Sequence, residues 1–264
     1  MRYEDRLDAA GLEAELVGAD SLWRTVLAVS ETGSTNADLA QQARDGAPAG
    51  TVLTAHYQSA GRGRLGRAWS APPGSAVAVS ILLRPERDPA RWTWLPLLAG
   101  LAVADSLRGL AGVPAVLKWP NDVLVDGAKI CGVLAERVET SQGPACVLGM
   151  GVNVALRAED LPVSTATSLA VLRPDTCFDR SQVIATVLAT LALLYHRWAA
   201  ELDEPLAAEY RRRCETIGRT VRVRAGDGSS VEGEAVAVDE QGRLRVRTSE
   251  RVWTFAAGDV THLR

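Results

Sequence analysis

The residues best suited to chemistry lie in one short stretch, residues 58–69, which reads Gln-Ser-Ala-Gly-Arg-Gly-Arg-Leu-Gly-Arg-Ala-Trp. Three glycines are interleaved with three arginines, and Trp69 closes the run. Glycine lets backbone N–H groups approach a ligand closely, and the guanidinium group offers a fixed fork of donors that suits phosphate or carboxylate. The stretch therefore predicts a loop that holds a polyanion, with Trp69 available to stack on a base. A solvated basic turn is the alternative interpretation.

The glycines of this loop also match the Gly-x-Gly-x-x-Gly fingerprint of dinucleotide-binding proteins. That fingerprint requires a helix to begin at the glycines, so that the helix N-terminus can hold a pyrophosphate. Two prolines and a glycine at residues 72–74 prevent a helix from starting there. No Gly-Lys-Ser/Thr sequence follows the glycines, which excludes a P-loop. The positive charge of the loop must therefore come from its arginine side chains.

Polar side chains also stand where other predicted elements begin or end. Ser34, Thr35 and Asn36 precede a predicted helix, where they can cap it or contact a small polar ligand, and capping is the reading favoured locally. Residues 118–122, Lys-Trp-Pro-Asn-Asp, present a lysine, an amide and a carboxylate at a proline-directed turn. Their alternative interpretation is a surface ion pair between the lysine and the aspartate. Lys129 follows an Asp-Gly hairpin signal and lies near that tight turn.

Apolar patterning indicates the elements that must position these groups. It predicts strands over residues 23–29, 50–56, 75–83, 115–119, 123–127, 129–136 and 146–153. It predicts helices over residues 4–19, 37–43, 92–110, 181–202 and 205–214, the third of them buried because it is apolar nearly all round. Gly149 and Gly151 in the last strand suggest close approach of a backbone or a ligand.

The pattern changes after residue 217. Short alternating strands over residues 220–224, 231–238, 244–248 and 252–256 fit a small, partly open β-barrel. The sequence therefore predicts two domains, residues 1–217 and residues 218–264. No flexible linker separates them, so we expect the second domain to dock on the first.

Composition limits the classes of function. The 264 residues carry 29 basic and 32 acidic side chains, a net charge of −3 and a pI of about 5.7. This balance argues against non-specific nucleic-acid binding. Four scattered cysteines and three histidines show no zinc-ligand spacing. No signal peptide and no run of about 18 apolar residues is evident. We therefore expect a cytoplasmic protein with no nucleic-acid partner and no membrane association.

Five motifs, in this order and at these separations, resemble those of biotin protein ligases. They are the Gly-Ser-Thr-Asn turn at 33–36, the arginine loop, Lys-Trp-Pro-Asn-Asp at 118–122, Lys-Ile-Cys-Gly-Val-Leu at 129–134 and Gly-Met-Gly-Val-Asn at 149–153. The resemblance covers the chain from about residue 25 onward. Leu65 stands where a further arginine is common in the family, and Cys131 where alanine is common.

The implied fold is of the α/β (α+β) class. It is a mixed β-sheet with helices, similar to the catalytic domain of class II aminoacyl-tRNA synthetases, followed by a small C-terminal barrel similar to Src-homology domains. The family often carries an N-terminal winged helix that represses transcription. This sequence leaves no room for one and is similar to the monofunctional kind.

The resemblance also implies a two-step reaction. Biotin and ATP form biotinyl-5′-adenylate and pyrophosphate with Mg²⁺, and biotin then passes to a lysine of the biotin carboxyl carrier domain of an acyl-CoA carboxylase such as acetyl-CoA carboxylase. An anion that attacks a polyanion needs fixed positive charge around it and little proton transfer, which agrees with a site rich in arginine and lysine.

The site residues follow from the same motifs. The implied catalytic residues are Lys129, Arg64 and Arg67. The implied biotin contacts are Ser34, Thr35, Asn36, Gln58, Arg62, Gly63, Arg64, Lys129 and Asn153. The implied ATP and adenylate contacts are Arg64, Arg67, Trp69, Lys118 and Asn121. Asp122 is the candidate for Mg²⁺, because this ion is usually held by few protein carboxylates.

Two alternatives remain open at this point. A lipoate-protein ligase shares the fold and the adenylate chemistry, although the Gly-Arg-Gly-Arg loop favours biotin. A non-catalytic regulator that binds biotinyl-adenylate is the other, and the acidic pI argues against it. We also expect the arginine loop to be mobile when empty, because its arginines repel one another within a Debye length of ~8 Å.

Overall fold

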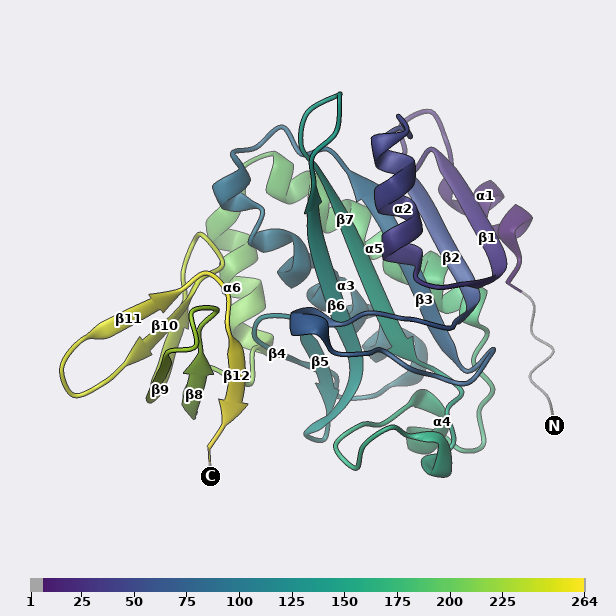
Figure 1. The fold of residues 1–264 in the computed structure, drawn as a ribbon. Helices are drawn as coiled ribbons and strands as arrows, with labels where there is room; N and C mark the ends of the chain where they lie inside the picture. Colours follow the sequence, from purple (N-terminus) through teal and green to yellow (C-terminus); the bar gives the residue numbers. More distant parts are fainter. Residues whose placement is uncertain (1–6, 264) are drawn as a thin grey trace.

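A seven-stranded mixed β-sheet forms the centre of the structure, a computed structural model in which residues 7–263 are described (Figure 1). Its strands are β1 (Thr25–Thr32), β2 (Thr51–Gln58), β3 (Ala76–Leu83), β4 (Val116–Lys118), β5 (Asp122–Val125), β6 (Ala128–Val138) and β7 (Ala145–Asn153). They lie in the order β1-β2-β3-β7-β6-β5-β4. The β1–β2 pair is parallel and the other neighbours are antiparallel. The predicted mixed sheet is confirmed, with shifts of a few residues at the strand ends.

The helices cover the two faces of this sheet unequally. They are α1 (Ala9–Leu16), α2 (Thr35–Arg44), α3 (Trp94–Ala111), α4 (Leu169–Leu172), α5 (Arg180–Ala199) and α6 (Asp203–Arg213), with 3₁₀ turns η1 (Arg64–Gly66), η2 (Pro89–Arg91) and η3 (Ala158–Asp160). In Figure 1, α3 and α5 lie behind the sheet, whereas α2 lies in front of it beside the loop that carries η1. The predicted helix over residues 4–19 is shorter, and its residues 4–6 lie outside the described part of the chain.

Helix α3 is the buried core helix that its apolar composition predicts. It packs against α5 and the central strands, and residues such as Leu101, Ala102 and Leu107 are fully buried. The segment Pro89–Ala111 is long and apolar enough to cross a membrane by length and composition alone, but 67% of its most apolar window is buried inside the fold. The hydrophobic effect of this burial accounts for its composition.

The second domain is an antiparallel five-stranded sheet. Its strands are β8 (Thr220–Arg224), β9 (Ser230–Val238), β10 (Leu244–Arg247), β11 (Val252–Phe255) and β12 (Asp259–His262), in the order β11-β10-β9-β8-β12. Val221 and Val223 are buried while Arg222 and Arg224 are exposed, the alternation expected of a strand with one solvated face. The sheet fits the predicted small barrel, but the prediction omitted β12, whose four residues pair with β8.

The second domain docks on the first through the turn between β9 and β10. Three consecutive carbonyl oxygens, those of residues 240–242, accept hydrogen bonds from Trp94 Nε1 (2.7 Å), Thr93 Oγ1 (2.5 Å) and Trp119 Nε1 (3.0 Å). Gly242 has φ +73°, and a Cβ there would lie 2.9 Å from a methyl group of Leu97. These contacts agree with the expected docking and place the β12 end of the second domain beside the arginine loop.

Candidate active site

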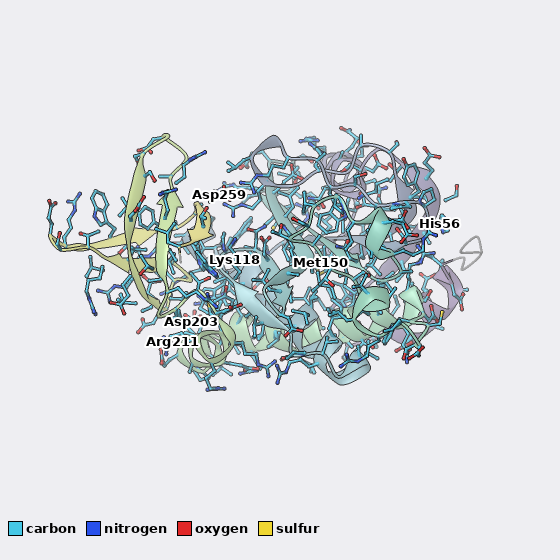
Figure 2. The ribbon with its side chains drawn as sticks, turned by 90° about the horizontal axis from the view of Figure 1, so that it is seen from below. His56, Lys118, Met150, Asp203, Arg211 and Asp259 are labelled. Carbon is cyan, nitrogen blue, oxygen red and sulfur yellow. The ribbon has the colours of Figure 1, made fainter. Side chains whose placement is uncertain are left out.

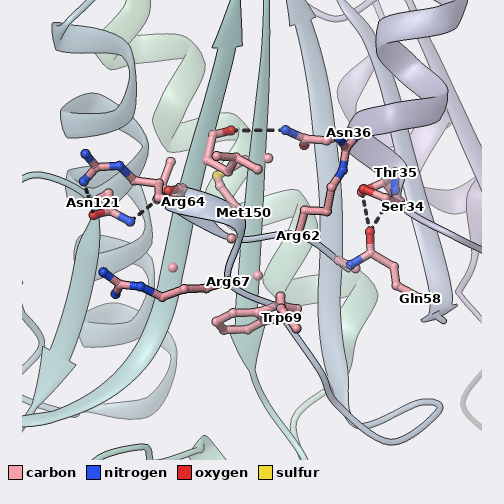
Figure 3. A pocket seen from close by; sticks show the side chains of 18 of the residues that line it. Ser34, Thr35, Asn36, Gln58, Arg62, Arg64, Arg67, Trp69, Asn121 and Met150 are labelled. Atoms are coloured by element: carbon pink, nitrogen blue, oxygen red, sulfur yellow. Dashed lines mark hydrogen bonds between the residues drawn. The ribbon is translucent and has the colours of Figure 1, made fainter. Parts of the chain in front are cut away.

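A cleft lies between the arginine loop and the face of the sheet that α2 leaves open (Figure 3). Twelve of the predicted site residues line it: Ser34, Thr35, Asn36, Gln58, Arg62, Gly63, Arg64, Arg67, Trp69, Asn121, Asp122 and Lys129. They come from elements that are far apart in sequence, namely the start of α2, the end of β2, the arginine loop and strands β5 and β6. The fold therefore brings the motifs together in one place.

One end of the cleft carries uncharged polar side chains, with Arg62 beside them (Figure 3). Ser34 is the N-cap of α2, and its hydroxyl accepts from the backbone N–H of Ala37 at 3.5 Å. Gln58 Oε1 accepts from the backbone N–H of Thr35 at 2.8 Å and lies 3.0 Å from the Thr35 hydroxyl. The Ser-Thr-Asn turn thus caps the helix, as the local pattern favours, and it also faces the cleft, while its contact with a ligand stays a prediction.

The arginine loop folds back on itself as a short hairpin. The N–H of Gly63 donates to Arg67 O at 2.7 Å, and the N–H of Trp69 donates to Gly61 O at 2.8 Å. Its only helical turn, η1, has three residues and contains Leu65 at φ 56°. No helix begins at the glycines, which removes the dinucleotide fingerprint on structural grounds.

Each arginine of the loop has a partner on a different element. Arg64 donates to Asn121 Oδ1 at 2.9 Å and to Gly258 O at 3.3 Å, and Arg67 lies 2.5 Å from an oxygen of Asp259. Arg62 is 3.9 Å from the Glu136 carboxylate. These contacts offset the mutual repulsion that the sequence implied, and mobility of the empty loop stays a prediction.

Burial and charge set the electrostatics of these arginines. Burial lowers the pKa of Arg64, and the charges of Asp122 and Asp259 offset part of that shift. The hydrogen bond from Arg67 holds the pKa of the Asp259 carboxyl below its ordinary value. Both guanidinium groups therefore stay cationic at neutral pH beside the cleft, as phosphate binding requires.

Lys129 reaches the cleft because of a β-bulge. The register between β5 and β6 shifts so that Leu124 faces Lys129 while Val123 faces Cys131. In a regular strand Lys129 and Cys131 would share a face, but the bulge turns the lysine toward the cleft and leaves the cysteine fully buried. Lys129 Nζ lies 2.6 Å from Asp122 Oδ1 and 5.9 Å from the centroid of the Trp69 ring. Burial raises the pKa of the Cys131 thiol to about 12, so this departure from the family pattern is chemically inert.

The indole ring of Trp69 packs on two glycines of neighbouring strands. Gly132 of β6 pairs with Gly151 of β7. A Cβ at Gly132 would lie 3.2 Å from the indole, and a Cβ at Gly151 would overlap the ring. The close approach that the sequence predicted at Gly151 is therefore made by a side chain of the same chain.

Two predicted contacts lie outside the cleft. Asn153 is buried, and its amide donates to Thr167 O at 2.9 Å, so it supports the 154–168 connection instead of lining the cleft. Lys118 lies at the junction with the second domain near Asp259 (Figure 2). There its charge adds to the effect of burial, which lowers the pKa of His262 to about 4. Both residues were assigned from motifs at or near the end of a predicted strand, and such motifs alone do not fix which way a side chain points.

Sequence reasoning missed three residues that complete the site. Asp259 lines the cleft from the second domain, and no local signal could connect it to a loop about 190 residues earlier. Ser80 and Glu136 lie just behind the cleft wall and contact Asn36. Ser80 carried a usable signal, because it is the one hydroxyl in the otherwise apolar strand β3.

The donor set for a divalent metal is small. Among residues 7–263, no group of three or more His, Cys, Asp or Glu side chains could hold a metal ion. Asp122 offers a single carboxylate in the cleft, beside Lys129. This fits Mg²⁺, which is commonly held by one or two carboxylates together with substrate phosphates, and it does not fit a resident metal with an all-protein ligand set.

Comparisons with known proteins all point to the same protein family. The model of the biotin/lipoate A/B protein ligase family matches residues 29–153, and that of the biotin protein ligase C-terminal domain matches residues 216–263. The chain is 42% identical to a biotin–[acetyl-CoA-carboxylase] ligase of Mycobacterium tuberculosis, over all of this chain and 98% of that protein. It is 32% identical to the bifunctional ligase/repressor BirA of Bacillus subtilis, over 95% of this chain and 76% of that protein.

A solved structure extends the likeness to three dimensions. The biotin protein ligase of Aquifex aeolicus, in complex with biotin and ATP, superposes with a TM-score of 0.77 at 27% identity, over 90% of this chain and 98% of that one. Both family models match this chain, one relative matches it over nearly its whole length, and the solved structure shares its fold. The cleft contains residues of all five motifs that resemble this family. On this evidence the chain belongs to the biotin protein ligases.

Proposed function

We propose that this protein is an ATP-dependent biotin protein ligase that transfers biotin to a biotin carboxyl carrier domain of acetyl-CoA carboxylase. The observation that carries the proposal is that side chains suited to each part of the two substrates line one cleft (Figure 3). Uncharged polar side chains at one end suit the ureido head of biotin. The cations Arg64, Arg67 and Lys129 suit a carboxylate and a phosphate, and Trp69 and Asn121 suit an adenine; all five line the cleft. The names of the Mycobacterium and Aquifex proteins point to the same substrates.

In the first step a carboxylate oxygen of biotin attacks the α-phosphorus of ATP, and the bond to the departing pyrophosphate breaks. Negative charge builds on the phosphoryl oxygens during this displacement. Lys129, Arg64 and Arg67 supply fixed positive charge there, which stabilises the transition state without proton transfer. Mg²⁺, held by Asp122 and phosphate oxygens, would neutralise further phosphate charge.

In the second step the amine of a carrier lysine attacks the carbonyl carbon of the mixed anhydride. The carbon–oxygen bond to AMP breaks, the nitrogen loses a proton, and a biotinyl amide remains. We assign residues 1–217 as the catalytic domain. Residues 218–264 complete the ATP end of the cleft through Gly258 and Asp259, which contact Arg64 and Arg67. We place the reaction in the cytoplasm, in keeping with the free thiols of all four cysteines.

Exchange of labelled pyrophosphate into ATP tests this function against its nearest alternative. Purified protein with ATP and Mg²⁺ is expected to catalyse exchange when biotin is added and not when lipoic acid is added. Exchange that depends on lipoic acid would assign the chain to the lipoate-protein ligases. Tight binding of biotinyl-adenylate without any exchange would make it a non-catalytic regulator.

Arg64 tests how the cleft retains its intermediate. Arg64→Gly removes a cation that joins Asn121 to Gly258 O, so the loop loses one of its ties to each domain. Hydrogen bonds to charged groups contribute about 1.5–3 kcal/mol. We therefore expect biotinyl-adenylate to dissociate roughly 10- to 100-fold faster, as measured by stopped-flow displacement. Arg251→Gly, on the far side of the second domain, is the control. An unchanged dissociation rate in Arg64→Gly would show that the loop does not hold the intermediate.

A further inference from the structure

A chain of hydrogen bonds runs behind the polar end of the cleft and crosses four elements. Ser80 on β3 is fully buried, and its hydroxyl lies 2.7 Å from Thr35 Oγ1 and 2.6 Å from Asn36 Oδ1. Asn36 Nδ2 donates to Glu136 Oε2 on β6 at 2.7 Å and lies 3.4 Å from Leu134 O. Ser80 and Glu136 do not themselves line the cleft. Ser80 reaches it through Thr35 and Asn36, and Glu136 reaches it through Asn36 and, at 3.9 Å, through Arg62.

The chemistry of these neighbours permits one orientation of the Asn36 amide. A backbone carbonyl and a carboxylate can only accept, so the NH₂ group must face Leu134 O and Glu136. The oxygen of the amide then faces Ser80, whose single proton must be donated to it. Asn36 is only 4% exposed, so a flipped amide would bury two acceptors against each other.

The same reasoning fixes the neighbouring groups. Because the Ser80 proton is used for Asn36, the Thr35 hydroxyl must donate, either to Ser80 or to Gln58 Oε1. Gln58 Oε1 also accepts the backbone N–H of Thr35, which directs the NH₂ group of Gln58 the other way. The polar end thus has a set pattern, in which Asn36 Oδ1 is an acceptor and Gln58 Nε2 a donor.

The position of Asn36 is fixed as well as its orientation. A Cβ at Gly149 would overlap the Asn36 amide, so the amide rests directly on the backbone of β7. Glu136 is the one charged member of the chain, and its side chain is 34% exposed. It is 3.9 Å from Arg62, a weak and exposed ion pair, against 2.7 Å from Asn36. Its closer interaction is therefore the hydrogen bond to the amide.

We propose that Ser80 and Glu136 are positioning residues that hold the Asn36 amide as a fixed acceptor and so make the cleft selective for a cyclic urea over an apolar ring head. The inference rests on the proposed function, because it assigns the polar end of the cleft to the head of biotin. A urea offers both N–H donors and a carbonyl acceptor, whereas a dithiolane offers neither. A site built to hydrogen-bond a substrate N–H discriminates strongly against analogues that lack it.

Ser80→Ala is the first test. It leaves the Asn36 oxygen without the donor that holds it in place, so biotin should bind about 5- to 150-fold more weakly, the range for an unsatisfied buried group. Affinities for ATP and for lipoic acid, used as a competitor, are expected to stay the same. Ser106→Ala is the matched control, because Ser106 is also a buried serine, bonded to Thr190 and remote from the cleft. It should lower the melting temperature without changing any of the three affinities.

Substitutions of Glu136 supply an independent test, because this side chain is partly exposed and its replacement perturbs folding less than that of the buried Ser80. Glu136→Gln keeps an oxygen that can accept from Asn36, so biotin affinity should stay within about threefold of wild type. Glu136→Ala removes the acceptor and should weaken biotin as Ser80→Ala does. If Ser80→Ala does not fold, this pair carries the test alone.

The outcomes separate the inference from the proposed function. A wild-type protein that shows no biotin-dependent pyrophosphate exchange would remove the function itself. With wild type active, equal losses of biotin and ATP affinity in folded Ser80→Ala would show a merely structural serine and overturn the inference. Glu136→Gln as impaired as Glu136→Ala would also overturn it, because the carboxylate would then act through its charge on Arg62.

Discussion

Replacing Lys129 with alanine is expected to lower the rate of biotinyl-adenylate formation by about 10²–10³-fold, the scale for loss of one positioned transition-state donor. Lys129 is held at both backbone atoms: its N–H donates to Thr165 O at 2.7 Å, and its carbonyl accepts from Thr167 at 2.8 Å. The bulge of β6 aims its ammonium into the cleft beside Asp122. A group fixed in this way can stabilise charge as it develops, without reorganisation during the reaction.

Single-turnover formation of the adenylate measures this effect apart from product release. Biotin affinity should change far less than the rate, because the interaction strengthens as charge builds on the phosphoryl group. Lys118→Ala is the matched control: it removes a lysine that lies close in sequence but outside the cleft, and we expect a rate within a few-fold of wild type. Near-normal adenylate formation by Lys129→Ala would remove this residue from the mechanism.

A methyl group at Gly151 is expected to raise the KM for ATP by roughly 5- to 150-fold while leaving biotin binding nearly intact. The added Cβ overlaps the Trp69 indole, so the ring must move away from its packing position on β6 and β7. Stacking of a base on an aromatic side chain contributes about 1–3 kcal/mol, which sets the size of the loss. Gly149→Ala should show the opposite pattern, because its Cβ overlaps the Asn36 amide at the polar end.

Two further variants show whether displacement of the indole causes the loss of ATP affinity. Gly109→Ala in α3 adds the same methyl group where no atom lies within 4 Å, and it should leave both KM values unchanged. Combining Gly151→Ala with Trp69→Ala should cost little more than Trp69→Ala alone, since both remove one platform. Additive losses would mean that Gly151 acts on ATP by some route other than the indole.

Much of the fold could be predicted because its signals are local. Strand β3 reads as a continuous apolar run, and α3 is apolar on all sides, so burial on both faces follows directly from composition. The motifs of the site were equally visible, since arginine-glycine loops and capping turns are short-range features. β12 was missed because its four residues, Asp-Val-Thr-His, form a strand only by pairing with β8.

The missing parts of the site depend on tertiary structure. The orientation of Lys129 depends on a one-residue bulge, and a sequence pattern with period two cannot indicate one. Asn153 was assigned to the biotin contacts because the motif at 149–153 resembles that of the family, yet its amide donates to Thr167 O. Asp259 meets Arg67 only because the second domain docks through the carbonyl groups of residues 240–242. Such long-range contacts leave no local trace in the chain.

Transfer of labelled biotin to a carrier domain tests the central claim most directly. The full-length protein is incubated with ¹⁴C-biotin, ATP, Mg²⁺ and the isolated biotin carboxyl carrier domain of an acetyl-CoA carboxylase, and label on the carrier is followed over time. We predict stable label on a single carrier lysine that requires ATP, is lost when that lysine is changed to arginine, and slows about 10²–10³-fold with Lys129→Ala. An unlabelled carrier in the presence of adenylate formation, or label spread over many lysines by the wild-type protein, would contradict the account.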